Sequence, residues 1–288
     1  MANQDSTNTS EGRAITHRAA PWLRFSIPAV LLAIIGNVIA LTVVRIYAGL
    51  TPVFLPQALA QDIVSLALVS PAWLILAVLA LRGSLRAYLL WLGVLAFTVY
   101  NYVIYTFSIP FGPLLPVWIA VLGLSIFALI GGIATVDPVS VAACFTGRRA
   151  LSVAGWFLIL TGVLFGFLWL SEDVPALLAG RVPKSVTDMA LPTNPVHVLD
   201  LAFFLPAVIA TGARVLKRNP IACTLAAPFI VFLVLTGMPI MVTPVVQMVR
   251  GEVAAWGVVI PIGTLVAVSV GLLAWLLSTM QADGHDTV

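Results

Sequence analysis

The chain has 288 residues, of which 61% are hydrophobic and only 9% are charged. A soluble protein carries about 25% charged residues, so this composition excludes an ordinary soluble domain and makes membrane lipid the expected partner of most of the surface. The net charge of +3 does not indicate nucleic acid, because basic side chains in such a chain gather at span ends and meet anionic headgroups.

Both ends of the chain are polar. Residues 1–20 form a predicted disordered cytoplasmic tail, and residues 282–288 form a second, short one. The apolar run that starts near Pro21 continues to about Leu50, which is longer than the roughly 7–15 residue core of a signal peptide. We therefore expect residues 21–281 to form a single transmembrane domain.

Eight segments of this domain are long and apolar enough to cross a bilayer, which takes about 20 residues in a helix. Turns marked by proline or glycine, such as Arg82-Gly83-Ser84 and Asn219-Pro220, separate them. The predicted fold is an all-α polytopic helical bundle, with spans near 24–48, 61–81, 87–107, 114–135, 150–170, 196–216, 221–247 and 255–280.

The basic residues divide unequally between the two sides that these spans define. Ten lie on one side and four on the other, and the richer side is predicted to be cytoplasmic. Both termini are then cytoplasmic. The ten are Arg13, Arg18, Arg24, Arg82, Arg86, Arg148, Arg149, Arg214, Lys217 and Arg218, and the four are Arg45, Arg181, Lys184 and Arg250.

Two connections are long. Residues 171–195 include Pro175, Pro183 and Pro192 and are predicted to form an external loop or lid rather than a helix of any length. Residues 136–149 form the longest cytoplasmic loop. A duplication of four spans is numerically compatible with the count, but the two halves show no convincing match in sequence, which argues against an inverted-repeat transporter fold.

Polar side chains within the spans gather at the predicted external end. Because polar groups are costly in a membrane, we expect them to line a polar pocket there, covered by residues 171–195. The candidate ligand-binding residues are Arg45, Asp62, Asn101, Tyr105, His197 and Asp200.

Each of these groups also has a structural interpretation. Asp62 would pair with Arg45 or favour the first turn of its helix, as Asp200 would in the sixth span. His197 and Asp200 share a helix face, so the carboxylate could orient the imidazole as in a general-base pair or form a local hydrogen bond. Asn101 should face the bundle interior, toward a ligand or a neighbouring helix. The sequence Thr193-Asn194-Pro195 is predicted to form the N-cap and entry turn of the sixth span.

Several chemistries lack their motifs. The chain has no GxSxG, HExxH, phosphate-binding glycine loop or paired DxxD cluster. Two cysteines (Cys144 and Cys223) and three histidines are too few and too scattered for a zinc or haem site. We therefore expect no metal and no cofactor.

Two stretches, Tyr100–Tyr105 and Thr193–Asp200 with the following Leu201–Pro206, resemble sequences of an uncharacterised family of multi-pass integral membrane proteins of bacteria and archaea. The resemblance covers most of the membrane region. It implies the cytoplasmic membrane of a prokaryote and carries no activity.

Three functions remain open. The leading hypothesis is the binding or movement of a small or lipid-like molecule through the external pocket, with hydrogen bonds from Asn101 and Tyr105 and an anionic contact from Arg45. The second is an intramembrane lipid-modifying enzyme with His197 as its base and Asp200 as the orienting group. The third is a structural or assembly subunit that packs against a protein partner.

Overall fold

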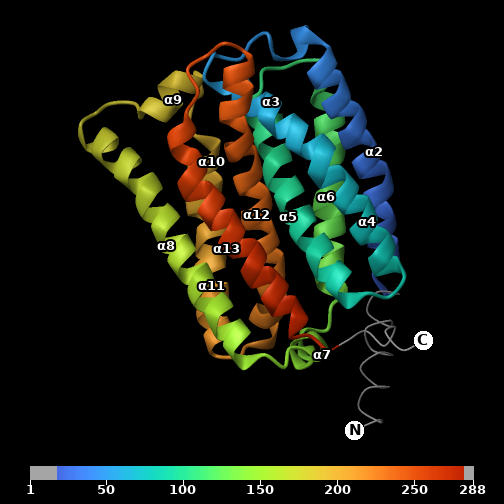
Figure 1. Cartoon of the computed structure of the whole chain (residues 1–288). Coiled ribbons are helices and arrows are strands. Elements are labelled where there is room, and N and C mark those ends of the chain that lie inside the picture. The colour runs from blue at the N-terminus through green and yellow to red at the C-terminus, as the bar shows by residue number, and fades with distance from the viewer. Residues whose placement is uncertain (1–17, 282–288) are drawn as a thin grey trace.

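The structure, a computed structural model, describes residues 18–281, so most of the tail predicted for 1–20 and all of 282–288 lie outside the described residues. Eight helices in this range are long and apolar enough to cross a membrane. They form an all-α bundle (Figure 1), which confirms the predicted fold class.

The spans are α2 (Ala20–Thr42); α3, η2 and α4 (Phe54–Val64, Ser65–Val69 and Ser70–Leu81); α5 (Leu85–Ser108); α6 (Leu115–Thr135); α8 (Arg148–Leu178); α10, η3 and α11 (Pro195–Leu199, Asp200–Phe204 and Leu205–Leu216); α12 (Pro220–Val249); and α13 (Val259–Ser278). Shorter helices η1 (Val44–Tyr47), α7 (Pro138–Cys144), α9 (Lys184–Met189) and η4 (Trp256–Val258) lie between them.

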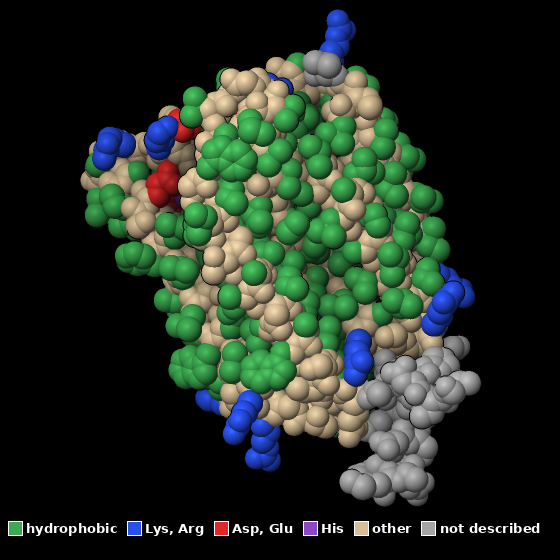
Figure 2. Space-filling view, viewed as in Figure 1, with side chains coloured by type: hydrophobic (Ala, Val, Ile, Leu, Met, Phe, Trp, Pro, Cys, Tyr) green, Lys and Arg blue, Asp and Glu red, His purple; other side chains and the backbone are tan. Residues whose placement is uncertain are grey.

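On the face that Figure 2 shows, hydrophobic side chains cover the middle, and lysine and arginine side chains lie toward the two ends. One end, the terminal end, holds α7 and the first and last described residues. The other end, the cavity end, holds η1 and α9 (Figure 1). A surface of this kind suits lipid in the middle and water or headgroups at both ends.

Three span ends differ from the sequence prediction. The first span stops at Thr42 rather than near 48, because Val43 is extended (φ −103°, ψ 95°) and the chain turns into η1. The second begins at Phe54 rather than 61. Its Pro56 lies in the first turn, where the missing N–H costs no helical hydrogen bond.

The third difference corrects the prediction that residues 171–195 hold no helix. The helix α8 continues through Pro175 to Leu178, and α9 follows at Lys184. A proline inside a helix removes one hydrogen bond but need not end the helix. Here α8 ends within one turn after Pro175.

The two halves of the bundle share their irregular features at a constant spacing, which the sequence alone did not reveal. The π-helical segments η2 and η3 begin at Ser65 and Asp200, 135 residues apart. The same spacing separates the starts of α4 and α11, the ends of these helices, and the starts of α5 and α12.

The turns that follow α4 and α11 match as well. Gly83 and Arg218 both have positive φ (101° and 58°). The next residues, Ser84 and Asn219, both cap the following helix by accepting a hydrogen bond from the backbone N–H three residues on. Agreement at this many positions indicates an internal duplication of four spans, which we call the first half (20–135) and the second half (148–278).

Equivalent residues of the two halves meet where α5 packs against α12. The rings of Phe97 and Phe232, 135 residues apart, lie 6.4 Å apart. A methyl group on Gly93 would lie 2.7 Å from the carbonyl oxygen of Pro228, its own counterpart. Contact between a residue and its counterpart is what a two-fold axis produces. Since each half has four spans, both halves run in the same direction and this pseudo-two-fold axis follows the bundle.

Candidate functional site

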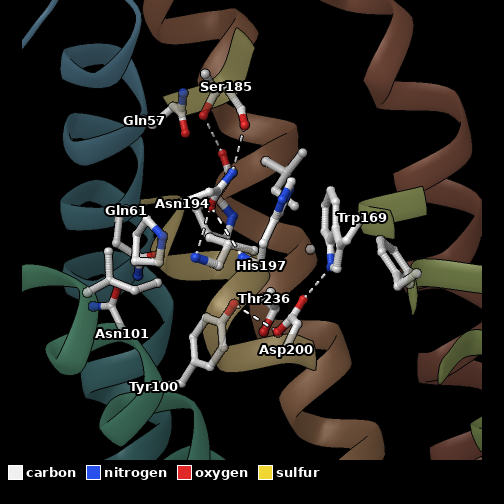
Figure 3. Close-up of a pocket in the computed structure, with 18 of the residues that line it drawn as sticks. Gln57, Gln61, Tyr100, Asn101, Trp169, Ser185, Asn194, His197, Asp200 and Thr236 are labelled. Carbon is white, nitrogen blue, oxygen red and sulfur yellow. Dashed lines mark hydrogen bonds between the residues drawn. The ribbon is translucent and has the colours of Figure 1, made fainter. Parts of the chain in front are cut away.

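A cavity of about 500 Å³ lies between the two halves. The first half contributes residues of α3 and α5, and the second half contributes residues of α8 to α13. Most of its wall is apolar, with rings from Phe97, Phe165, Phe204 and Phe232. Polar side chains from several helices converge on it (Figure 3). A largely apolar cavity with a few convergent polar groups is typical of a small-molecule site.

Asn101 supplies the first of these polar groups. Its side chain lines the cavity and lies beside Gln61 in Figure 3. The residue is only 7% exposed, and its amide makes no hydrogen bond with any residue that the structure describes. A buried amide usually has a partner. The amide of Asn101 is therefore available to a molecule in the cavity, and its counterpart in the other half, Thr236, lines the same cavity.

His197 is held from several sides. Asn194 caps α10 by accepting hydrogen bonds from the N–H groups of Val196 and His197, which confirms the predicted cap. The ring of His197 stacks on Trp169 with centroids 4.5 Å apart. Its Nδ1 lies 2.9 Å from Asp173 Oδ1, and its Nε2 lies 3.9 Å from Glu172 Oε2. The imidazole is thus oriented by a carboxylate on α8.

Asp200 does not pair with His197, in contrast to the proposed pairing within one helix face. Its Oδ1 accepts a hydrogen bond from the Tyr100 hydroxyl (3.0 Å), and its Oδ2 accepts one from Trp169 Nε1 (2.8 Å). Trp169 therefore links the two residues, stacking on His197 and donating to Asp200. His197 and Asp200 both line the cavity, which agrees with their positions on the same face of the helix. Asp200 opens the π-helical segment η3 rather than the first turn of its span.

Asp62 belongs to a separate buried cluster. Its carboxylate accepts hydrogen bonds from Tyr47 (2.6 Å) and from Tyr105 (2.7 Å), and the residue is 1% exposed. It does not line the cavity and lies in the third turn of α3 rather than the first. Tyr105 lines the cavity but directs its hydroxyl to Asp62 and to the Ala58 carbonyl oxygen.

Arg45 is exposed, does not line the cavity and forms no described ion pair with Asp62. Of the six candidate residues, the structure thus brings four to the cavity wall: Asn101, Tyr105, His197 and Asp200. The anionic contact expected from Arg45 has no support in this arrangement.

The contribution of α8 to the cavity wall was not predicted from the sequence. Phe165, Trp169 and Glu172 all line the cavity, and they follow the i, i+4, i+7 spacing of one helix face. The spacing is present in the sequence, but Glu172 lies beyond residue 170, where the predicted span ends. Asp173, adjacent to Glu172, then reaches His197 from the same helix.

The helix α9 covers this part of the cavity. The Ser185 N–H donates to Glu172 Oε1 (2.8 Å), and Asn194 Nδ2 donates to Ser185 Oγ (3.1 Å). Ser185 thus joins α8 to the start of α10, and Asp188 of α9 lines the cavity while it pairs with Lys184. Residues 171–195 contact the site as the predicted lid would, although through helices.

In comparisons with known proteins, the chain matches no family model, no curated protein and no solved structure.

Proposed function

We propose that this multi-pass membrane protein binds a small amphiphilic or lipid-like molecule in the cavity between its two halves and moves it across or out of the membrane. The observation that carries the proposal is a largely apolar cavity of about 500 Å³ with the unpaired, buried amide of Asn101 in its wall. Ligand pockets commonly measure about 300–1,000 Å³ and combine apolar walls with a few polar groups.

The duplication supports movement as well as binding. Transporters built from parallel repeats place their site at the repeat interface and expose it by tilting one half against the other. Here residues of both halves line the cavity, and the α5–α12 contact lies on the pseudo-two-fold axis. The unequal distribution of basic residues predicts that the cavity end faces the extracytoplasmic side.

An intramembrane enzyme is the second candidate, and one contact favours it. His197 Nδ1 is 2.9 Å from Asp173 Oδ1, Nε2 is 3.9 Å from Glu172 Oε2, and both His197 and Glu172 line the cavity. A carboxylate that holds an imidazole in this way prepares it to act as a general base. The orienting group would be Asp173 rather than Asp200. In this case the retained molecule would be converted by wild-type protein, and His197→Ala would abolish conversion without loss of folding.

Mass spectrometry of molecules retained by gently purified protein tests the proposal. Wild type should retain one enriched species, and Asn101→Ala should lose it because the amide then offers no hydrogen bond. The matched control is Asn37→Ala. Asn37 is also a buried asparagine with an unpaired amide nitrogen, but it does not line the cavity.

Retention of the same species by wild type and both variants would argue against this site. Bulk lipid alone in all three, together with a stoichiometric protein that purifies with the chain, would favour the third candidate, a structural or assembly subunit.

A further inference from the structure

We propose that the molecule bound in the cavity is an organic cation with an apolar body. This inference rests on the proposed binding function and specifies its ligand class. It depends on the signs of the charges in the cavity wall, on the aromatic rings around them and on the buried amide of Asn101.

The charges in the cavity wall are acidic. Glu172, Asp188 and Asp200 line the cavity, and no lysine or arginine is among the lining residues that the structure describes. Lys184 pairs with Asp188 and turns mostly outward, with 81% of its side chain exposed. An anionic headgroup would therefore meet repulsion, whereas a cation would be attracted.

Asp200 is the most buried of these three acidic residues, and no described ion pair neutralises it. It is 7% exposed, and its oxygens accept hydrogen bonds only from the uncharged Tyr100 and Trp169 in the described part of the chain. A buried carboxylate without a cation is costly, and a cation that enters beside it offsets that cost. His197, when protonated, already lies between Asp173 and Glu172.

Aromatic rings surround the same carboxylate. Tyr100 and Trp169 bind it directly, and Tyr100 packs edge-on against Phe204 and Phe232 (centroids 6.4 and 5.1 Å apart). All four residues line the cavity. The faces of aromatic rings attract cations, and this is how proteins recognise alkylated ammonium groups.

Asn101 gives independent evidence that the cavity is built for a polar ligand. It is more than nine-tenths buried, has no hydrogen-bond partner among the described residues and points into the cavity (Figure 3). Its carbonyl oxygen can accept a hydrogen bond from an ammonium group, and its dipole can face a cation that has no N–H.

Two hydrophobic ions of nearly equal size and opposite charge, tetraphenylphosphonium and tetraphenylborate, test the charge preference. We would measure equilibrium binding of each ion, and of the neutral amphiphile dodecanol, to the full chain in phosphatidylcholine nanodiscs, with empty discs subtracted. Wild type should bind tetraphenylphosphonium saturably at one site and should show no saturable binding of tetraphenylborate. Asp200→Asn should weaken the binding of the cation at least tenfold.

Glu252→Gln is the matched control, because it removes one negative charge at the same end of the bundle but outside the cavity wall. It should leave the affinity for the cation unchanged. Should Asp200→Asn fail to fold by size-exclusion chromatography, Glu172→Gln replaces it, with the same loss of affinity expected.

Saturable binding of dodecanol or of tetraphenylborate at least as tight as that of the cation would overturn the cation assignment while leaving the binding function intact. Unchanged affinity for the cation in Asp200→Asn would do the same. Absence of saturable binding of all three probes by wild type would count against both this inference and the proposed function.

Discussion

Polar side chains near the cavity fall into two groups at the scale of single residues. The first group lies inside the first half, where the carboxylate of Asp62 accepts hydrogen bonds from the hydroxyl groups of Tyr47 and Tyr105. Asn101, in contrast, has no described protein partner and faces the cavity. The first arrangement is explained by stability alone, whereas the second leaves an amide that is accessible to a molecule in the cavity.

Tyr47→Phe tests the structural role of the Asp62 cluster. The substitution removes one of the two hydroxyl groups that donate to a buried carboxylate, and an unsatisfied buried polar group costs about 1–3 kcal/mol. We expect the free energy of unfolding in detergent to fall by about this amount. Retention of the cavity ligand should persist, since neither Tyr47 nor Asp62 lines the cavity.

Tyr102→Phe provides the comparison. Tyr102 is equally buried, and its hydroxyl makes no hydrogen bond with any described residue. The substitution Tyr102→Phe should therefore lower the free energy of unfolding much less than Tyr47→Phe does. Equal losses of stability in the two variants would show that the hydrogen bond to Asp62 is not what stabilises the cluster.

The polar candidates could be found from sequence, but their partners could not. The depth of each residue in its span follows from hydropathy. The predicted spans therefore place Asn101, His197 and Asp200 at the same end of the bundle. Partners depend on the rotation and tilt of each helix. Trp169 and Asp173, which bind Asp200 and His197, come from a helix whose end was placed eight residues too early.

At the scale of helices, the apolar runs predicted eight spans correctly, but their composition did not reveal where the backbone changes direction. Val43 turns the chain out of α2 within a continuing apolar run. The π-helical segments η2 and η3 are also invisible to hydropathy. A π-helical turn contains one additional residue and often occurs at functional sites. Here η3 begins with Asp200 in the cavity wall.

Close helix packing leads to a second prediction, for α2 against α6. A methyl group on Gly131 would lie 2.2 Å from the ring of Trp22, whereas one on Gly123 of the same helix would meet no atom within 4 Å. We expect Gly131→Ala to lower the free energy of unfolding by about 1–3 kcal/mol, as overpacking does. Gly123→Ala should be neutral or raise it by up to about 1 kcal/mol.

Unfolding in a denaturing detergent, followed by circular dichroism, would compare these two variants with wild type. If Gly131→Ala were as stable as Gly123→Ala, α2 and α6 would not approach each other as closely at Trp22 as described.

At the scale of the whole molecule, the two halves are related by a pseudo-two-fold axis, and the cavity lies between them. Side chains of the two halves still match in one stretch, where the offset of 135 residues pairs Leu66 with Leu201, Pro71 with Pro206 and Phe97 with Phe232. Outside this stretch the side chains have diverged, whereas the backbone features have kept their spacing. The duplication is therefore hard to recognise from sequence without the offset, which the helix ends, π-helical segments and caps supply.

The orientation in the membrane gives a third prediction. Single cysteines at Val182 and Arg149, in a chain whose two native cysteines are replaced by alanine, place one thiol at each end of the bundle on exposed residues. In intact cells a membrane-impermeant maleimide should label Val182→Cys and leave Arg149→Cys unlabelled, because the basic residues predict a cytoplasmic terminal end. Labelling of Arg149→Cys alone would reverse the orientation and place the cavity end in the cytoplasm.

Whether the cavity between the halves holds a molecule is best measured by cryo-electron microscopy of the protein in lipid nanodiscs. We expect density in the cavity that reaches the amide of Asn101 and the carboxylate of Asp200. The same map for Asn101→Ala should lack that density. A cavity closed by its own side chains, with the Asn101 amide hydrogen-bonded to another residue of the chain, would show that no molecule binds there.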